Sequence, residues 1–407
     1  MEHNNVIFSL LDSPAFGGAE QYLFSNLKFL NNHGFEIVLA TNNEQVKNEL
    51  KSRLSLKEQE TFKIINAPYR LDAIGNLKGL VKYFFSLPKA LIWCFFALKN
   101  LKKKHKKIIC LWSGFSDRLS FSFIANLLNC DLIWIEFGPL SPVFKKNFGF
   151  PKYLYNFASN FPKYLITISK FTKIDILKHS EFKNQNIEII YPGIKIFTKD
   201  EIKKLKLKFD AWRKKEGLEN KKIIGLVGRL ASESEIDHVL MAFSIVIKNL
   251  ESTDSQIELL IIGDGPDRKK YEDLAKKNKI DNLVKFVGFV SEDNKAILLS
   301  GCDFFIFPRA WELEGFGMTT IEAMSLGLPV LVPDFGPQIE IVTDNKEGFK
   351  YLPHDILDLS LKIIKMLNLD SKQVNLLSEN SFKRASDFSE DKMHNSFLLT
   401  LKTLLNK

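Results

Sequence analysis

Two glutamates on either side of a glycine turn are the residues best suited to chemistry in this sequence. Glu314 comes directly before Gly315, and Glu322 follows Met318 by four residues. A helix beginning at Met318 would offer free N–H groups and partial positive charge to a phosphate. A carboxylate one turn further on can accept hydrogen bonds from the vicinal hydroxyls of a ribose, and Glu314 could do the same for a sugar beyond the phosphates. This pattern predicts a site for a nucleotide-diphosphate sugar. The alternative is two ordinary surface acids near a helix start.

A strand, a turn, a helix and a second strand must hold these glutamates in place. Residues 304–307 are apolar and aromatic, which predicts a buried parallel strand. From Met318 the apolar residues recur every three positions, which predicts a helix that ends at Gly327. Pro329 then opens a short apolar run, which predicts the second strand.

The segment EGFGMTTIE, residues 314–322, resembles the signature of the retaining glycosyltransferases of family 4, which have the GT-B fold. The resemblance continues through LGLPVLVPDFGPQIEIV and is weaker in the N-terminal half. It implies that Glu314 faces the donor sugar and that Glu322 holds the ribose. It also implies that the backbone from Phe316 to Thr319 contacts the sugar and the diphosphate.

Arg229 is the candidate clamp for the diphosphate. It follows Gly228 near the end of a strand predicted over 222–230, and the carboxyl ends of such strands line the ligand site. An arginine can hold a diphosphate through two hydrogen bonds, although an exposed arginine without a ligand is an equal alternative. The resembling family has a lysine five residues later, where this chain has Ser234. Arg309 is a possible substitute.

A second glycine turn lies near the N-terminus. Gly17 and Gly18 separate a strand predicted over 6–11 from a helix predicted over 19–32, which is typical of the first unit of a nucleotide-binding α/β domain. The turn resembles the GGxE loop of family 4 and could equally be a plain tight turn. The donor-binding residues implied by the resemblance are Gly17, Gly18, Arg229, Glu314, Gly315, Phe316, Gly317, Met318, Thr319 and Glu322.

Glu136 completes the predicted catalytic set with Glu314 and Arg229. Many members of the resembling family carry a histidine at the end of the strand matched here by residues 131–137, and this chain has Glu136 near that place. Glu136 or Asp117 could supply the polar group, and a structural acid at a strand end is the alternative. None of the seven histidines has metal-ligand spacing, so no metal site is predicted. The resemblance likewise implies no metal requirement and no cofactor.

Length and alternation of strands and helices predict an α/β protein of two domains. The 407 residues are 45% hydrophobic and 26% charged, as in soluble globular proteins. We predict two Rossmann-like, doubly wound domains with a lysine-rich linker region at 195–221, and the resemblance to family 4 implies that they face a central cleft as in the GT-B fold. The expected parts are residues 1–195, residues 196–388, and a C-terminal helix over 389–407 that crosses back to the first domain.

Positive charge is concentrated in the N-terminal domain. Residues 1–195 hold 26 Lys and Arg against 15 Asp and Glu, although the whole chain has a net charge of only +9. A long apolar helix followed by six lysines lies within residues 77–107, which suits attachment to an anionic membrane surface. The alternative is an amphipathic helix of the domain with a solvated end. Neither a signal peptide nor a stretch of about 20 uncharged apolar residues is seen, so no spanning helix is expected.

The sequence therefore predicts a cytoplasmic, metal-independent enzyme of the hexosyltransferase type, which would be peripheral on the inner face of the membrane if residues 77–107 attach to lipid. Its donor would be a nucleotide-diphosphate sugar, and its acceptor a glycan or lipid-linked glycan of the cell envelope. No nucleic acid partner is predicted. The alternative is a weakened GT-B protein that binds a nucleotide sugar or glycan without transfer, which the absent lysine and histidine motivate. A sugar-nucleotide epimerase or a phosphorylase is a further alternative.

Overall fold

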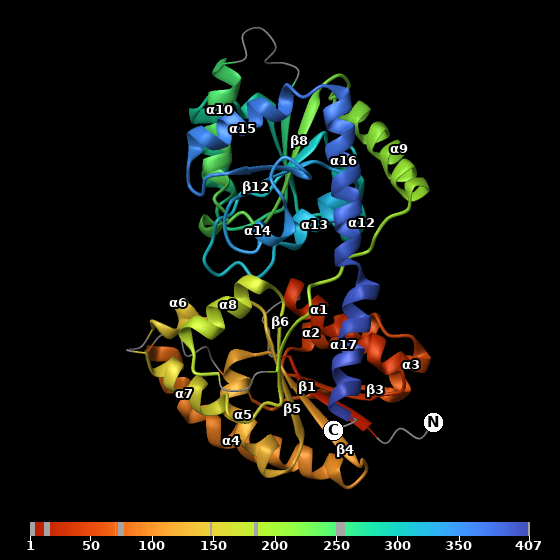
Figure 1. Cartoon of the computed structure of the whole chain (residues 1–407), viewed down its shortest axis with the longest axis vertical. Helices are drawn as coiled ribbons and strands as arrows, with labels where there is room; N and C mark the ends of the chain where they lie inside the picture. Colours follow the sequence, from red (N-terminus) through yellow and green to blue (C-terminus); the bar gives the residue numbers. More distant parts are fainter. Residues whose placement is uncertain are drawn as a thin grey trace. The chain divides into compact units, whose positions relative to one another are not determined.

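The computed structural model divides into two compact units (Figure 1). It describes residues 5–11, 17–69, 71, 77–146, 149–182, 186–249 and 257–405. Unit 1 comprises Met1–Gly193 and Asp391–Lys407, and unit 2 comprises Ile194–Glu390. The sequence placed these boundaries at 195 and 389. The last helix is thus part of unit 1 although it follows unit 2 in the chain.

Unit 1 is built on a seven-stranded parallel sheet in the order β3-β2-β1-β4-β5-β6-β7. Its central strands are apolar and almost fully buried, as expected for a parallel sheet covered on both faces. The strands are β1 (Asn5–Leu10), β2 (Glu36–Thr41), β3 (Phe62–Asn66), β4 (Lys107–Trp112), β5 (Asp131–Glu136), β6 (Tyr164–Thr167) and β7 (Ile187–Ile189). The helices are α1 (Gly18–Asn32), α2 (Glu44–Ser52), α3 (Leu56–Thr61), α4 (Leu77–Lys102), α5 (Phe115–Leu127), α6 (Ser141–Phe144), α7 (Phe150–Ala158), α8 (Lys170–His179) and α17 (Glu390–Leu405).

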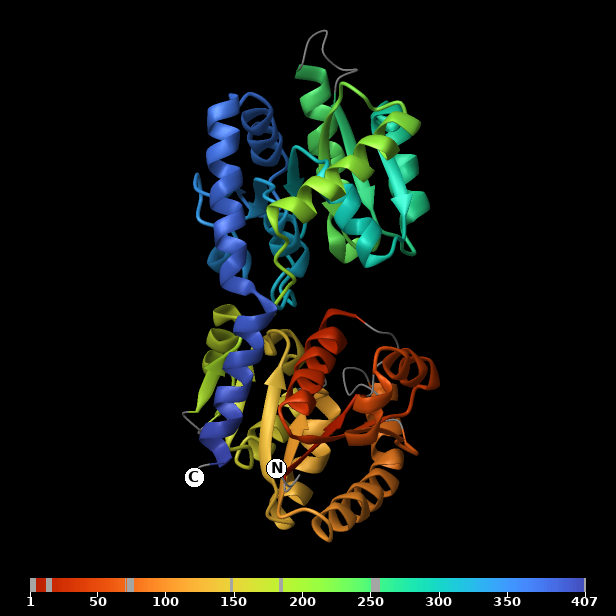
Figure 2. The same cartoon turned by 90° about the vertical axis from the view of Figure 1, so that its right-hand side faces the viewer.

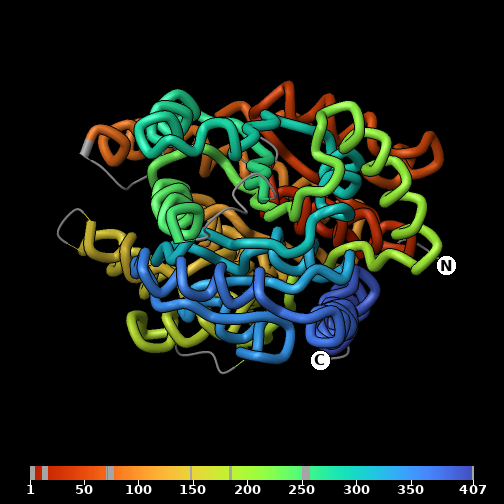
Figure 3. The backbone as a smooth tube through the Cα atoms, turned by 90° about the horizontal axis from the view of Figure 1, so that it is seen from above, coloured from red at the N-terminus to blue at the C-terminus, as the bar shows by residue number. Residues whose placement is uncertain are grey.

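Unit 2 is built on a six-stranded parallel sheet in the order β10-β9-β8-β11-β12-β13. Helices α10, α11 and α15 pack together on one face, and α9, α12, α13 and α16 pack on the other (Figures 1 and 3). The strands are β8 (Lys222–Val227), β9 (Ile257–Ile262), β10 (Val284–Gly288), β11 (Phe304–Ile306), β12 (Val330–Pro333) and β13 (Gly348–Tyr351). The helices are α9 (Lys199–Lys215), α10 (Ile236–Asn249), α11 (Arg268–Lys277), α12 (Glu292–Ser300), α13 (Met318–Ser325), α14 (Gln338–Ile341), α15 (Ile356–Leu367) and α16 (Ser371–Ala385), with short 3-10 helices η2 (Ser232–Ser234), η4 (Asp281–Leu283) and η5 (Ser386–Phe388).

Two parts of unit 2 differ from the sequence-based expectation. The edge strand β13 was not predicted, because its four residues include Lys350 and form no apolar run. The predicted linker region contains α9, which is part of unit 2 because the fully buried ring of Phe209 packs against Gly301 at the end of α12.

Helix α4 runs along the outer edge of unit 1 (Figure 2) and is apolar on both of its faces. Tyr83, Cys94 and Leu98 point into the core, whereas Phe85 and Phe96 are exposed. Among the described helices α4 alone is long and apolar enough to cross a membrane by length and composition, and only 17% of its apolar window is buried. The sequence-based expectation concerned an uncharged stretch of about 20 residues, and α4 contains none because Lys82, Lys89 and Lys99 interrupt it. Pro88 lies inside the helix without ending it.

The interior of unit 1 contains an ion pair between Arg118 of α5 and Glu136 at the end of β5. Arg118 Nη2 donates to Glu136 Oε1 at 2.9 Å, and Nη1 donates both to Glu136 Oε2 and to the carbonyl of Ile135. Both side chains are nearly fully buried, and the guanidinium lies over the ring of Trp134. Burial raises the pKa of Glu136, and the Arg118 charge opposes that shift.

Removing one partner of this pair should destabilise unit 1 more than removing both. We expect Arg118→Met to lower the free energy of unfolding by about 3–5 kcal/mol at neutral pH, because it leaves a buried carboxylate uncompensated. Arg118→Met/Glu136→Leu should recover part of that loss. The loss in the single variant should shrink as the pH falls, because protonated Glu136 buries no charge.

Amide hydrogen exchange at β5 in increasing urea measures this free energy in unit 1 alone. Equal destabilisation of the single and double variants would contradict the electrostatic explanation.

Candidate functional site

The turn between β11 and α13 is held in one conformation by a buried glutamine. Gly317, the residue before α13, has φ +92°, and a Cβ added there would lie 2.0 Å from Gln338 Nε2. Gln338 Nε2 donates to the carbonyl of Phe316 at 3.3 Å, and its Oε1 accepts from the Thr320 hydroxyl at 3.0 Å. Glycine is therefore required at 317, both for the backbone angle and for the approach of Gln338. The result is a helix start without a side-chain cap, at half-exposed Met318.

Glu314 lies at the beginning of this turn and is mostly buried. Its Oε1 accepts a 3.4 Å hydrogen bond from the backbone N–H of Phe316, and its Oε2 pairs with Arg309. The Arg309 guanidinium also lies 4.9 Å from the centre of the Trp311 ring. Arg309, which the sequence offered as a substitute for the absent lysine, is therefore the partner of Glu314 in this structure.

Glu322 lies one turn inside α13 and is paired with Lys295 of α12. Lys295 Nζ is 2.8 Å from Glu322 Oε2 and 2.8 Å from Glu292 Oε2. Burial raises the pKa of Glu322, and Lys295 opposes the shift. Burial also lowers the pKa of Lys295, but the two carboxylates outweigh it, so that the lysine pKa is raised.

Arg229 follows β8 and is exposed. No carboxylate lies within ion-pair distance of it among the residues that the structure describes. The backbone around it is fixed by the loop after β9: the N–H of Leu230 donates to the carbonyl of Asp264 at 3.0 Å. Gly263, at φ +139°, would place a Cβ 2.0 Å from the carbonyl oxygen of Gly228. This close packing fixes the backbone that carries the exposed Arg229 side chain.

The structure places these predicted residues at one edge of one sheet. Strands β8 and β11 are parallel neighbours, with Phe304 opposite Ile224. Parallel strands present their carboxyl ends to the same edge, so the loops carrying Arg229 and Glu314 leave unit 2 on the same side. Within unit 2 the arrangement combines an uncapped helix start with an unpaired guanidinium, and both favour a phosphate.

The predicted residues of unit 1 are Gly17, Gly18 and Glu136. Gly17 and Gly18 are exposed at the start of α1, and the Gly17 N–H donates to Glu20 Oε2 at 2.8 Å. That carboxylate already occupies one donor of the helix start. The preceding residues 12–16 lie outside the described part of the chain.

Both carboxylate oxygens of Glu136 are bonded to Arg118 in the core. This geometry favours the structural alternative for Glu136 over the catalytic one. Asp117 is also buried, against Gly114 before α5.

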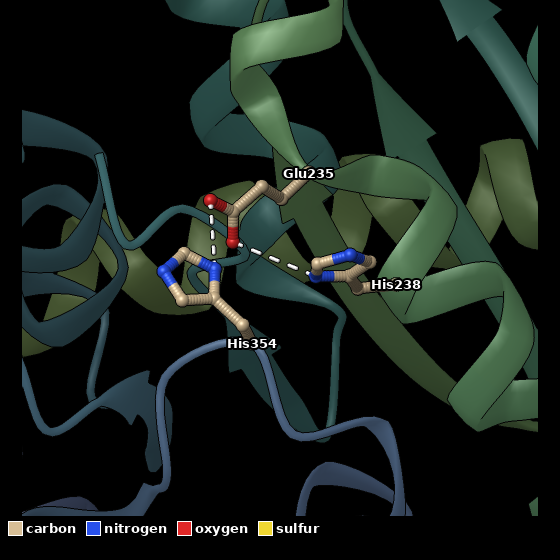
Figure 4. A group of neighbouring side chains, drawn as sticks. All are labelled: Glu235, His238 and His354. Atoms are coloured by element: carbon tan, nitrogen blue, oxygen red, sulfur yellow. Dashed lines mark ion pairs between the residues drawn. The ribbon is translucent and has the colours of Figure 1, made fainter.

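Sequence reasoning missed three further features of unit 2. Lys295 and Gln338 carry no motif that marks them, since their partners are distant in the chain. The third is a cluster of Glu235, His238 and His354, whose ligand-capable atoms all lie within 4.8 Å of one another (Figure 4). The spacing of the histidines gave no indication of it, because His354 comes from the turn between β13 and α15.

Comparison with known proteins agrees with this architecture. A family model described as "Glycosyl transferases group 1" matches residues 208–384. An uncharacterized glycosyltransferase of Methanocaldococcus jannaschii is 25% identical over 311 residues, which are 71% of this chain and 76% of that protein. The alpha-monoglucosyldiacylglycerol synthase of Streptococcus pneumoniae is 27% identical over 227 residues, which are 53% of this chain and only 49% of that protein.

A solved structure extends the likeness over both units. The crystal structure of HepE from Anabaena in complex with UDP matches with a TM-score of 0.75 at 18% identity, over 98% of this chain and 100% of that one. This likeness concerns the fold. Residues 208–384 thus match the glycosyl transferases group 1 model, and the chain as a whole has the fold of the GT-B glycosyltransferases.

Proposed function

We propose that this protein is a retaining glycosyltransferase. It would transfer a hexose from a nucleotide-diphosphate sugar to a glycan or lipid-linked acceptor in cell-envelope polysaccharide synthesis. The observation that carries the proposal is the turn at Gly317, which ends in the uncapped start of α13 and has Glu314 before it and Glu322 after it. The UDP bound to Anabaena HepE supports a nucleotide donor.

In this proposal the diphosphate is bound by Arg229 and the start of α13. Guanidinium and helix N–H groups stabilise the charge that develops on the leaving diphosphate, so they act more strongly in the transition state than in the ground state. Glu322 would accept the ribose hydroxyls and Glu314 a hydroxyl of the donor sugar. The acceptor hydroxyl would attack from the face that the diphosphate leaves, without a covalent enzyme intermediate. We propose that this step needs neither a metal ion nor a further cofactor.

The ion pairs of the two glutamates explain how acids can flank a diphosphate. Two bare carboxylates would repel it, at a cost of about 1 kcal/mol each even at 4 Å in water and more in a buried site. Arg309 neutralises Glu314, and Lys295 neutralises Glu322. Each carboxylate retains oxygen lone pairs that can accept from a hydroxyl. The pairs therefore keep the acceptors for sugar and ribose while they limit repulsion.

We propose further that α4 attaches unit 1 to an anionic membrane surface, on the cytoplasmic side. Its exposed apolar residues continue onto the neighbouring helices α5 and α7. These exposed side chains are Val81, Phe84, Phe85, Ile92, Phe96, Phe123, Leu127, Tyr153 and Phe157. Exposed lysines at 99, 102, 103, 104 and 106 follow at the end of α4 and would meet lipid phosphates. The lipid product named for the Streptococcus pneumoniae relative supports a lipid-linked acceptor.

Replacement of either glutamate should abolish most of the activity while the fold survives. Glu314→Ala and Glu322→Ala should each lower kcat/KM by about 10- to 100-fold, the value of one or two hydrogen bonds to a charged group. The matched control is Glu312→Ala, an exposed acid of the same loop. Release of nucleoside diphosphate from UDP, GDP and ADP sugars, with a membrane extract as acceptor, measures the activity.

Full activity in either glutamate variant would refute the site. Tight donor binding by the unmodified protein without any release would instead favour the binding protein that does not catalyse transfer.

Arg229 should contribute to the binding of a nucleoside diphosphate even when no sugar is attached to it. Arg229→Met should raise the Kd of the productive nucleoside diphosphate by about 10- to 100-fold, since a charge-assisted contact is lost. Lys248→Met, which removes an exposed cation from α10, should leave the Kd unchanged. Isothermal titration with UDP, GDP and ADP measures both, and equal Kd values in the two variants would contradict the role of Arg229.

The membrane proposal predicts that the protein floats with anionic vesicles at low salt and dissociates at high salt. Phe85→Ser/Phe96→Ser should reduce the bound fraction several-fold, because apolar contact with the acyl region is lost. Leu56→Ser is the matched control, because Leu56 and Phe85 are both 84% exposed but Leu56 lies on α3. Liposome flotation measures the bound fraction, and failure of the unmodified protein to bind would remove the membrane claim.

A further inference from the structure

Three side chains from two separate parts of unit 2 converge on one point (Figure 4). Glu235 directly precedes α10, His238 lies in the first turn of α10, and His354 lies in the turn between β13 and α15. His354 Nδ1 is 3.3 Å from Glu235 Oε1, and His238 Nδ1 is 3.6 Å from Glu235 Oε2. The two imidazole rings are nearly perpendicular, with centres 6.2 Å apart.

The two imidazole–carboxylate separations are close to those of ligands around a small cation, and one ligand atom from each residue lies within 4.8 Å of the others. Ligands about 2.0–2.1 Å from a tetrahedral Zn²⁺ lie about 3.3–3.4 Å from one another. Two imidazole nitrogens and one carboxylate oxygen are a common donor set for Zn²⁺ sites that keep an open position. The observed atoms could therefore bind one ion with small side-chain rotations.

An ordinary ion pair explains the cluster less well. Both imidazoles present Nδ1 to a single carboxylate, and they are its only ion-pair partners in the described part of the chain. A simple ion pair would need only one cationic partner for the Glu235 carboxylate, and a lysine or arginine would supply that charge at any pH. Glu235 and His354 also both adopt positive φ, +51° and +62°, a conformation that is more common for histidine but uncommon for glutamate. The backbone thus holds the Glu235 side chain in place at some cost.

We propose that Glu235, His238 and His354 bind a divalent transition-metal ion, with Zn²⁺ the best match to the donor set. The ion would connect the start of α10, the β13–α15 turn and the loop that leads to Glu314. The last connection exists because the N–H of Ala310 donates to Glu235 Oε2 at 3.4 Å. The ion would stabilise these segments and would leave one coordination position to water. It takes no part in the transfer step proposed above.

The test is metal binding by the purified full chain without a histidine tag. After dialysis against chelator, isothermal titration with Zn²⁺ should give one equivalent bound, and Co²⁺ should give the visible absorption bands of tetrahedral coordination. His354→Asn and Glu235→Gln should each weaken Zn²⁺ binding by at least about tenfold. Asparagine is chosen at 354 because it tolerates positive φ, so the turn should be preserved.

The matched control is His179→Asn in unit 1. His179 Nδ1 is paired with Asp175 Oδ1 at 3.1 Å, a histidine–carboxylate pair with no second histidine. This variant should retain the full equivalent of Zn²⁺. Loss of binding in His179→Asn, unchanged binding in both cluster variants, or no binding to the unmodified chain would overturn the proposal.

Thermal unfolding gives a second readout that does not depend on transferase activity. Saturating Zn²⁺ should raise the unfolding midpoint of the unmodified chain by a few degrees, as any ligand specific to the folded state does, and should not do so for Glu235→Gln. The metal proposal and the transferase proposal can fail independently. In excess chelator and at saturating donor, sugar transfer should persist even though no Zn²⁺ is bound. If instead the Glu314 and Glu322 variants kept full activity, the Zn²⁺ binding result would be unaffected.

Discussion

The candidate site depends on the two hydrogen bonds that Gln338 makes to the turn before α13. Its amide bonds the carbonyl of Phe316 on one side and the hydroxyl of Thr320 on the other, across the space that a Cβ at residue 317 would fill. The turn therefore has one conformation, and the direction of the α13 start follows from it. The positions of Glu314 and Glu322 follow as well, since they are only a few residues away on either side.

Charge balance is the second feature that organises unit 2. The acids closest to the α13 start are paired with Arg309 and Lys295, whereas Arg229 remains unpaired among the described residues. Such a distribution leaves a net attraction for an anion at the edge where β8 and β11 end. In unit 1 the opposite arrangement occurs, because Glu136 is enclosed with Arg118 and offers nothing to a ligand.

The two units differ in how they meet their surroundings. Unit 2 has a closed core under α10, α11 and α15 and carries its distinctive polar groups at one sheet edge. Unit 1 exposes apolar rings on α4, beside the lysines that account for much of its positive charge. In a helix that is apolar on both faces, each face is covered either by the rest of the protein or by lipid. The outer face of α4 has no such protein cover within the described residues.

Local sequence patterns were enough to predict the two doubly wound sheets and the segment from β11 to β12. Apolar runs, glycine turns and helical spacing are local properties, so they could be read without the fold. The edge strand β13 could not be predicted in this way. It is a strand because it pairs with β12, and its own four residues carry no strand pattern. Tertiary structure alone decided which partners the predicted side chains have: Lys295 for Glu322, Arg118 for Glu136, and His354 for Glu235. Such pairs join residues far apart in the chain, and only the packing of helices and strands sets the distances between them.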